Sequence, residues 1–247
     1  MILVDDSGWK EHAAKVAVLI PAWQPDERLA PLVSALAAAG FGAIVVVDDG
    51  SSPACAANFA SAEALPRVHL LRHAVNLGKG RALKTGMRYF LNELAGFEGL
   101  VTADADGQHL AADIERVARA MVEADGRAVL GSRGLVKDVP LRSRVGHWLT
   151  RHSFNLLLGQ RLKDTQTGLR GFPAAMLAEL VSLEGERYEY EMTVLAHLCR
   201  TGRCPLELPV ETVYIDGNRS SHFDPIRDSM RIYRVLARIA LHKGAAR

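Results

Sequence analysis

The sequence predicts an α/β fold with a mostly parallel central sheet flanked by helices. Short runs of continuous aliphatic residues recur along the first half of the chain, and stretches with apolar residues at helical spacing lie between several of them. Strands that are apolar on both faces belong in a sheet covered on both sides, and crossover helices make neighbouring strands parallel. Because 247 residues of 49% hydrophobic composition can bury one such core, residues 1–247 are expected to form a single domain.

Five segments have the composition of buried strands, since they are rich in aliphatic residues and end in turn-forming or charged residues. They span residues 16–22, 43–52, 67–73, 99–107 and 127–133. Three stretches have the apolar spacing of helices, and Gly40 supplies the stop signal of the first. These helices span residues 26–40, 79–94 and 112–124. The chain after about Leu135 is less regular and is expected to complete the same domain.

Composition limits the classes of protein. Thirty basic residues against 28 acidic ones give a net charge near zero, which argues against bulk nucleic-acid binding. No apolar run approaches the roughly 18 to 20 residues that span a bilayer, and the N-terminus carries acids where a signal peptide is basic. A cytoplasmic protein, soluble or peripheral to the inner face of a membrane, is therefore expected. Cys55, Cys199 and Cys204 are expected to be reduced thiols.

Pairs of acids follow two of the predicted strands. Asp48 and Asp49 end one strand, and Asp104 and Asp106 end another, just before Gly107. In such a sheet, ligands bind beyond the carboxyl ends of the strands, so four carboxylates are expected to crowd one edge. Their mutual repulsion calls for a cation, and Mg²⁺ or Mn²⁺ suits carboxylate ligands combined with substrate phosphates. Asp104 and Asp106 are therefore predicted to hold a divalent ion that carries a diphosphate.

Other interpretations of these segments exist. Two acids after a strand also cap the helix that follows. A calcium loop would need a third ligand before its glycine, which DADGQ lacks. Residues 78–85, GKGRALKT, do not have the order of a phosphate loop, and a glycine-rich turn that opens a helix explains them equally well.

Taken together, six segments resemble one family. VAVLIPAW, VVVDDGSS, NLGKGRALKTG, ADADGQH, GSR and DTQTGLRGF occur in the order and approximate spacing of family 2 glycosyltransferases, over about residues 16–230. The chain is most similar to the branch that transfers sugars to polyprenyl phosphate and dolichyl phosphate. The resemblance implies a GT-A fold with a Rossmann-like nucleotide-binding half, inversion at the sugar carbon and Mg²⁺ or Mn²⁺ as cofactor. It also implies a UDP- or GDP-sugar donor and a lipid-linked acceptor.

The resemblance also implies roles for individual residues. Asp104 and Asp106 match the metal-binding acids, and Arg170 matches a residue that lines the acceptor side. Those matched to donor binding are Pro21, Asp48, Asp49, Lys79, Asp104 and Arg219. Those matched to the reaction centre and the acceptor are Arg133, Asp164, Glu189 and Glu191, with Arg142 and Arg144 as further phosphate contacts. Where the family has IPAYNE, this chain has IPAWQPDE, so Trp23 replaces tyrosine and Asp26 or Glu27 is the candidate for the acid.

The acceptor decides which chemistry is needed. A lipid phosphate is already anionic, so alignment and charge neutralisation by arginines suffice. A hydroxyl acceptor requires a general base, for which Asp164, Glu189 and Glu191 are the candidates. A nucleotide-sugar binding module without turnover is a further alternative. A sugar nucleotidyltransferase is disfavoured, because VAVLIPAWQPDE lacks the glycine-rich loop of that class.

The C-terminal segment predicts a basic amphipathic helix over about residues 225–243, begun by Asp224 and Pro225. Its arginines recur at intervals of four, three and four, so they form one stripe on a mostly apolar helix. They are Arg227, Arg231, Arg234 and Arg238. Such a helix is predicted to lie on a membrane surface. The alternative is a helix that packs on the domain and exposes an arginine edge to solvent.

Overall fold

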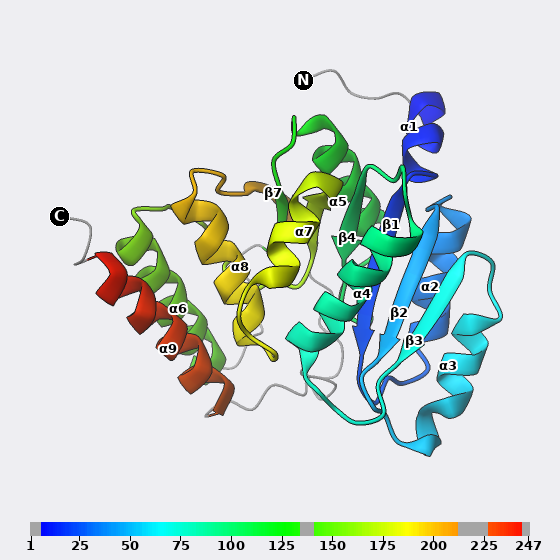
Figure 1. The fold of residues 1–247 in the computed structure, drawn as a ribbon, viewed down its shortest axis with the longest axis horizontal. Helices are drawn as coiled ribbons and strands as arrows, with labels where there is room; N and C mark the ends of the chain where they lie inside the picture. Colours follow the sequence, from blue (N-terminus) through cyan, green and yellow to red (C-terminus); the bar gives the residue numbers. More distant parts are fainter. Residues whose placement is uncertain (1–5, 134–140, 212–226, 244–247) are drawn as a thin grey trace.

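The computed structural model describes residues 6–133, 141–211 and 227–243, and within them the sheet has seven strands in the order β3-β2-β1-β4-β6-β5-β7 (Figure 1). The strands are β1 (Val16–Ala22), β2 (Ala43–Asp48), β3 (Val68–Arg72), β4 (Gly99–Thr102), β5 (Val129–Arg133), β6 (Arg170–Pro173) and β7 (Leu206–Val210). The predicted α/β class with a mostly parallel sheet is confirmed. The exception is β6, which runs antiparallel to both of its neighbours, β4 and β5.

Two predicted strands end earlier than expected, because their polar ends fold into turns. The strand beginning at residue 43 ends at Asp48, whose carboxylate accepts a hydrogen bond from the Ser51 amide at 2.8 Å. Gly50 turns the chain there with φ +69°. The strand beginning at residue 99 ends at Thr102 rather than 107, and Gly107 has φ +75° in the turn that follows. Positive φ is accessible to glycine at little cost, so glycine lets the chain turn shortly after each strand ends.

Helices cover both faces of the sheet. Alternate residues of β1 point to opposite sides, with Val18 and Ile20 in one core and Ala17 and Leu19 in the other. The first core is covered by α1 (Asp6–Ala13), α2 (Leu29–Ala38), α3 (Ala56–Glu63) and α5 (Ala111–Glu123). The second is covered by α4 (Lys79–Glu93), α7 (Ala174–Ser182) and α8 (Glu189–Arg200). Between β2 and α3 lies a short 3-10 turn, η1 (Pro53–Cys55).

Three helices pack together at one end of the sheet (Figure 1). They are α6 (Leu141–Leu158), α8 and α9 (Arg227–Lys243). Their shared core includes Phe154 of α6, Leu195 of α8, and Ile232 and Leu236 of α9. In the described parts of the chain, every helix is too short or too polar to cross a membrane.

The apolar side of the C-terminal helix is occupied by protein. Ile232 and Leu236 are buried against α6 and α8, so they are not available to lipid. The structure therefore shows the packed alternative, in which the helix lies on the domain with arginines at its edge. Asp224 and Pro225, predicted to begin this helix, lie outside the described residues.

One prediction about cysteine was wrong. Cys199 and Cys204 form a disulfide, whereas Cys55 is a free, buried thiol. The chain turns sharply after α8 at Gly202, which has φ +74°, and this turn brings the two Cα atoms within 4.0 Å.

Truncating Leu236 to alanine is predicted to lower the free energy of unfolding by about 2–5 kcal/mol, because it opens a cavity in the core shared by α6, α8 and α9. Met230 lies on the same helix but is 50% exposed, so Met230→Ala is predicted to change the free energy by less than about 0.5 kcal/mol. Urea denaturation of both variants measures the difference. Equal losses would show that α9 is not packed as described.

Candidate active site

A cleft of about 680 Å³ opens at the carboxyl edge of the sheet. Pro21 of β1, Asp49 after β2, and Asp104 and Asp106 after β4 line it. This is the edge at which ligands bind in open α/β sheets. The sequence-predicted residues that meet here are therefore Pro21, Asp49, Lys79, Asp104 and Asp106.

Lys79, the first residue of α4, forms two ion pairs in the cleft. Its Nζ lies 2.6 Å from Asp104 Oδ1 and 3.0 Å from Glu191 Oε2. The same ammonium lies 5.7 Å from the centre of the Tyr188 ring, within cation–π range. One lysine thus joins the end of β4, the start of α4 and the first turn of α8.

Burial and neighbouring charges shift the pKa values of Asp104, Lys79 and Asp106. Burial alone would raise the pKa of Asp104, but Lys79 outweighs it and lowers this pKa to about 2. Burial opposes the charge of Lys79, yet Asp104 and Glu191 raise the pKa of the lysine above its ordinary value. The pKa of Asp106 is raised, first by burial and then by the negative charge of Asp104. Asp104 is thus held in its charged form by Lys79, whereas burial favours the neutral form of Asp106.

The backbone around Asp104 is shaped to fit its carboxylate. A side chain at Gly168 would place its Cβ 2.6 Å from Asp104 Oδ2, so only glycine leaves room there. Thr102 Oγ1 donates to the Gly168 carbonyl at 2.7 Å and fixes this approach. On the other side, the Asp104 amide donates to Nδ1 of the buried His109 at 3.1 Å. Burial lowers the pKa of His109, consistent with a neutral ring that accepts this bond.

Arg28 holds the loop that carries Asp106. Its guanidinium donates to the Asp106 carbonyl at 3.1 Å and to both carboxylate oxygens of Asp26, at 2.6 to 3.1 Å. Of the two candidates in IPAWQPDE, Asp26 is the acid that lines the cleft. Because Asp26 is engaged by Arg28, the pair anchors the backbone of the acidic loop. Arg28 was not predicted from the sequence as a residue of the site.

Asp48 and Asp49 make hydrogen bonds within the protein. Asp49 is 3% exposed and accepts from the amides of Leu77 and Gly78 at 2.9 and 2.8 Å. Its carboxylate also lies 2.7 Å from His73 Nδ1, so it positions the loop that leads into α4. Asp48 caps the turn after β2, as described above. Their contact with a nucleotide stays a prediction.

Arg133 and Asp164 form a partly buried ion pair, and the charge of Arg133 acts on Asp104. Nε of Arg133 donates to Asp164 Oδ2 at 2.7 Å, and Nη2 lies 3.3 Å from Oδ1. Burial raises the pKa of Asp164, but Arg133 outweighs burial and lowers it. Arg170 is fully enclosed and donates to the Glu191 carbonyl at 2.6 Å, so it holds the start of α8.

The structure separates the two glutamates of RYEYEM. Residues two apart on a helix lie about 200° apart around its axis, and only Glu191 faces Lys79. Glu189 instead accepts from the amides of Glu186 and Arg187 at 3.0 and 3.2 Å. Arg219 lies outside the described residues. Arg142 and Arg144 fall within α6, but their side chains also lie outside what the structure describes.

Several residues of the cleft were not predicted from the sequence. Arg187 and Tyr188 form a wall of it, and the first turn of α9 contributes Arg227, Asp228 and Arg231. Tyr188 adjoins the predicted glutamates, and this was the only local signal for the wall. The approach of α9 depends on tertiary packing, which the local pattern does not reveal.

Comparison with known proteins agrees with this geometry. Residues 17–181 match the model of glycosyl transferase family 2. The chain is 28% identical to a UDP-N-acetylglucosamine–dolichyl-phosphate N-acetylglucosaminyltransferase from Methanococcus voltae, over 90% of this chain and 94% of the relative. It is also 28% identical to an undecaprenyl-phosphate mannosyltransferase from Micrococcus luteus, over 81% of this chain and 84% of that protein.

Solved structures share the fold. Glucosyl-3-phosphoglycerate synthase from Mycobacterium tuberculosis, in complex with Mn²⁺, UDP-glucose and phosphoglyceric acid, superposes with a TM-score of 0.71 at 15% identity. The superposition covers 96% of this chain and 84% of the synthase. The segment that matches the family model includes Asp104 and Asp106 at the carboxyl edge of the sheet, and Lys79 beside them. The chain therefore belongs to glycosyl transferase family 2.

Proposed function

We propose that this enzyme moves a sugar, with inversion, from a UDP- or GDP-sugar to a polyprenyl phosphate or a related lipid-linked phosphate. The main support for the proposal is the cleft at the sheet edge, which Asp104 and Asp106 line and in which Lys79 pairs with Asp104. The dolichyl-phosphate and undecaprenyl-phosphate transferases similar to this chain support the acceptor class. The proposed location is the cytoplasmic face of the membrane that holds such an acceptor.

Asp104 and Asp106 fit a divalent ion. Among the described residues, no third His, Cys, Asp or Glu completes a metal-binding group with them. Mg²⁺ and Mn²⁺ are often bound by one or two carboxylates together with substrate phosphates, so the donor diphosphate would complete the ligand set. Burial and the neighbouring Asp104 raise the pKa of Asp106, so a bound cation would stabilise its charged form. Bound there, such an ion would neutralise negative charge on the departing nucleoside diphosphate.

Further residues would bind the donor around the metal ion. Pro21, Asp48 and Asp49 lie at the strand ends, where the nucleoside would fit. Lys79, whose Nζ lies 2.6 Å from Asp104 Oδ1, would contact the diphosphate. Tyr188 and Arg187 enclose the other side of the cleft and would exclude water from the reacting centre.

Each of the three candidate bases already makes ion pairs or hydrogen bonds within the protein, and this favours a phosphate acceptor. Asp164 is bound in a fork by Arg133, Glu191 faces Lys79, and Glu189 accepts two backbone amides. A carboxylate whose charge is stabilised in this way is a weak base, and the lowered pKa of Asp164 expresses this. An acceptor that is already anionic needs no base. Arg133 would instead neutralise part of the charge that the two phosphate-bearing substrates bring together.

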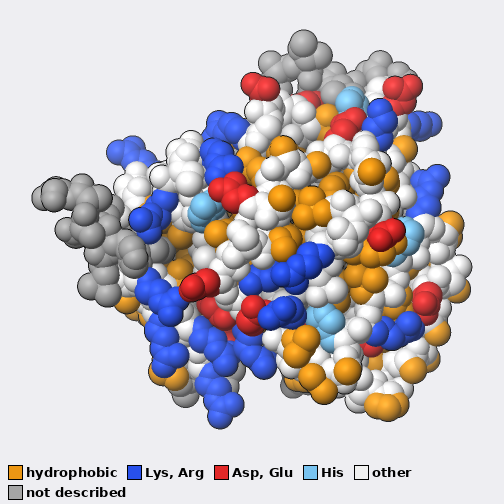
Figure 2. All heavy atoms as spheres, in the orientation of Figure 1, with side chains coloured by type: hydrophobic (Ala, Val, Ile, Leu, Met, Phe, Trp, Pro, Cys, Tyr) orange, Lys and Arg blue, Asp and Glu red, His pale blue; other side chains and the backbone are white. Residues whose placement is uncertain are grey.

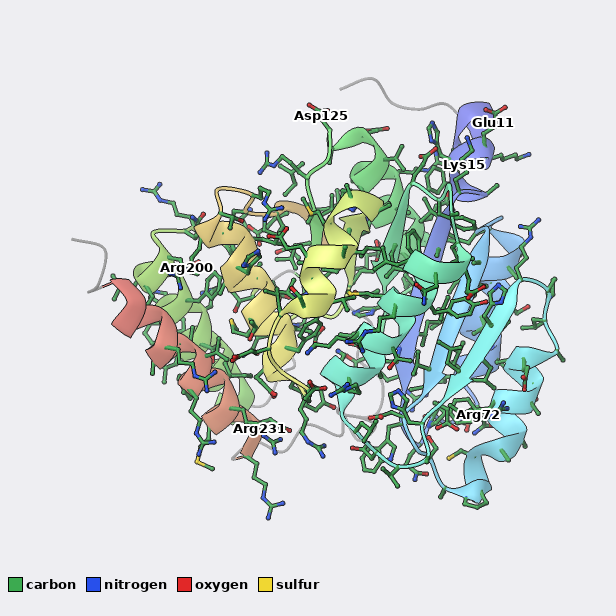
Figure 3. The ribbon with its side chains drawn as sticks, in the orientation of Figure 1. Glu11, Lys15, Arg72, Asp125, Arg200 and Arg231 are labelled. Atoms are coloured by element: carbon green, nitrogen blue, oxygen red, sulfur yellow. A yellow bond between two sulfur atoms is a disulfide. The ribbon has the colours of Figure 1, made fainter. Side chains whose placement is uncertain are left out.

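Asp106→Asn is predicted to lower turnover by more than about 100-fold while the fold is retained, because it removes a metal ligand that stabilises the leaving group. The measurement is release of nucleoside diphosphate at saturating donor and limiting Mn²⁺. Asp125→Asn is the matched control, since Asp125 is exposed and far from the cleft (Figure 3). Normal turnover of Asp106→Asn at limiting metal would show that the metal assignment is wrong.

A second prediction separates phosphate from hydroxyl acceptors. With polyprenyl phosphate as acceptor, Arg133→Gln is predicted to lower turnover by at least about 30-fold, because the phosphate loses its cation. Asp164→Asn and Glu191→Gln should each cost less than Arg133→Gln, since neither acid removes a proton. Donor affinity and the melting temperature are measured alongside to detect misfolding. Abolished turnover in either acid variant, with donor binding intact, would instead indicate a general base and a hydroxyl acceptor.

A further inference from the structure

A second groove, of about 760 Å³, lies between α8 and α9 next to the cleft. Four arginines line it. Arg200 comes from the end of α8, and Arg231, Arg234 and Arg238 come from α9. Figure 3 labels one arginine from each helix, Arg200 and Arg231. Figure 2 shows basic side chains gathered along α9, which gives this part of the surface a positive potential.

The four arginines outnumber the two acids, Glu184 and Glu189, that also line the groove. Arg231 pairs with Asp228 at 2.8 Å, and Arg238 pairs with Glu184 at 2.8 Å. Within the described parts of the chain, Arg200 and Arg234 have no acidic partner, and both are exposed. Guanidinium groups bind phosphate oxygens in pairs, so the groove is suited to phosphate groups.

The lining of the groove is mixed, with apolar side chains among the charged and polar ones. Leu183, Ala196 and Val235 line it together with the arginines. Arg231 also lines the active-site cleft, so the groove and the cleft are neighbours. Arginines beside apolar side chains can bind a phosphate while their aliphatic stems lie on the apolar part of the groove.

We propose that the groove between α8 and α9 binds the phosphate headgroups of an anionic phospholipid bilayer. The inference goes beyond the proposed reaction, and the choice of lipid over free phosphate rests on the proposed lipid-linked acceptor. Because Arg231 borders both the groove and the cleft, docking through the groove would hold the mouth of the cleft next to the bilayer. The contact uses the arginine edge of α9, since the helix's apolar residues Ile232 and Leu236 are buried in protein.

The test is co-sedimentation of the full chain with vesicles of phosphatidylcholine alone or of phosphatidylcholine mixed with phosphatidylglycerol. The groove variant is Arg200→Gln with Arg234→Gln, neither of which lines the active-site cleft. The matched control is Lys15→Gln with Arg72→Gln, which removes the same charge from exposed positions away from the groove (Figure 3). Each basic residue near an anionic surface contributes about 1 kcal/mol, about fivefold in affinity, so the groove variant should bind at least about tenfold more weakly.

The expected result is salt-sensitive binding of the unaltered chain to anionic vesicles only, lost in the groove variant and kept in the control. Equal losses in both variants would show diffuse charge attraction and overturn the proposal, as would equal binding to neutral vesicles. Competition by inorganic phosphate beyond that of chloride at equal ionic strength would assign the groove to a free anion and also overturn it. Turnover of a lipid phosphate in detergent micelles is measured separately, so failure of the proposed reaction and failure of membrane docking are distinguishable.

Discussion

The ion pairs of Lys79 with Asp104 and Glu191 organise the site. They connect three elements that are distant in the sequence, and tight packing around them sets the geometry. A side chain at Gly78 would place its Cβ 2.4 Å from the Glu186 carbonyl, and one at Gly80 would meet Tyr190 at 2.6 Å. Glycine at these two positions therefore allows the start of α4 to lie directly against the segment before α8, within reach of the two carboxylates.

This arrangement also explains how acids can accumulate at one edge of the sheet. Lys79 compensates Asp104 and Glu191, Arg133 compensates Asp164, and Arg28 compensates Asp26. Asp106 is left with a raised pKa beside the Asp104 carboxylate. These three cations face five acids when Asp106 is included, so a divalent ion bound by Asp104 and Asp106 would offset the excess negative charge.

Much of this could be predicted from the sequence, because the signals are local. Aliphatic runs such as AIVVVD indicate strands that are buried on both faces, and acids at the ends of strands indicate the edge of the sheet at which a ligand binds. The direction of β6 was not predictable, since RGFP is short and carries glycine and proline. The resemblance left both Glu189 and Glu191 as candidates for the acid near the acceptor, and it did not indicate which of them meets Lys79. That choice, and the approach of α9 to the cleft, depend on tertiary packing between distant segments.

The central claim is that Asp104 and Asp106 bind a divalent ion jointly with the donor diphosphate. Titration of Mn²⁺ followed by electron paramagnetic resonance, with and without UDP or GDP, tests it most directly because it needs no acceptor and no turnover. The account predicts that the nucleotide tightens Mn²⁺ binding to the unaltered chain, and that Asp104→Asn weakens this nucleotide-dependent binding by at least about tenfold. Mn²⁺ binding that is unaffected by the nucleotide, and equal in the unaltered chain and Asp104→Asn, would contradict it.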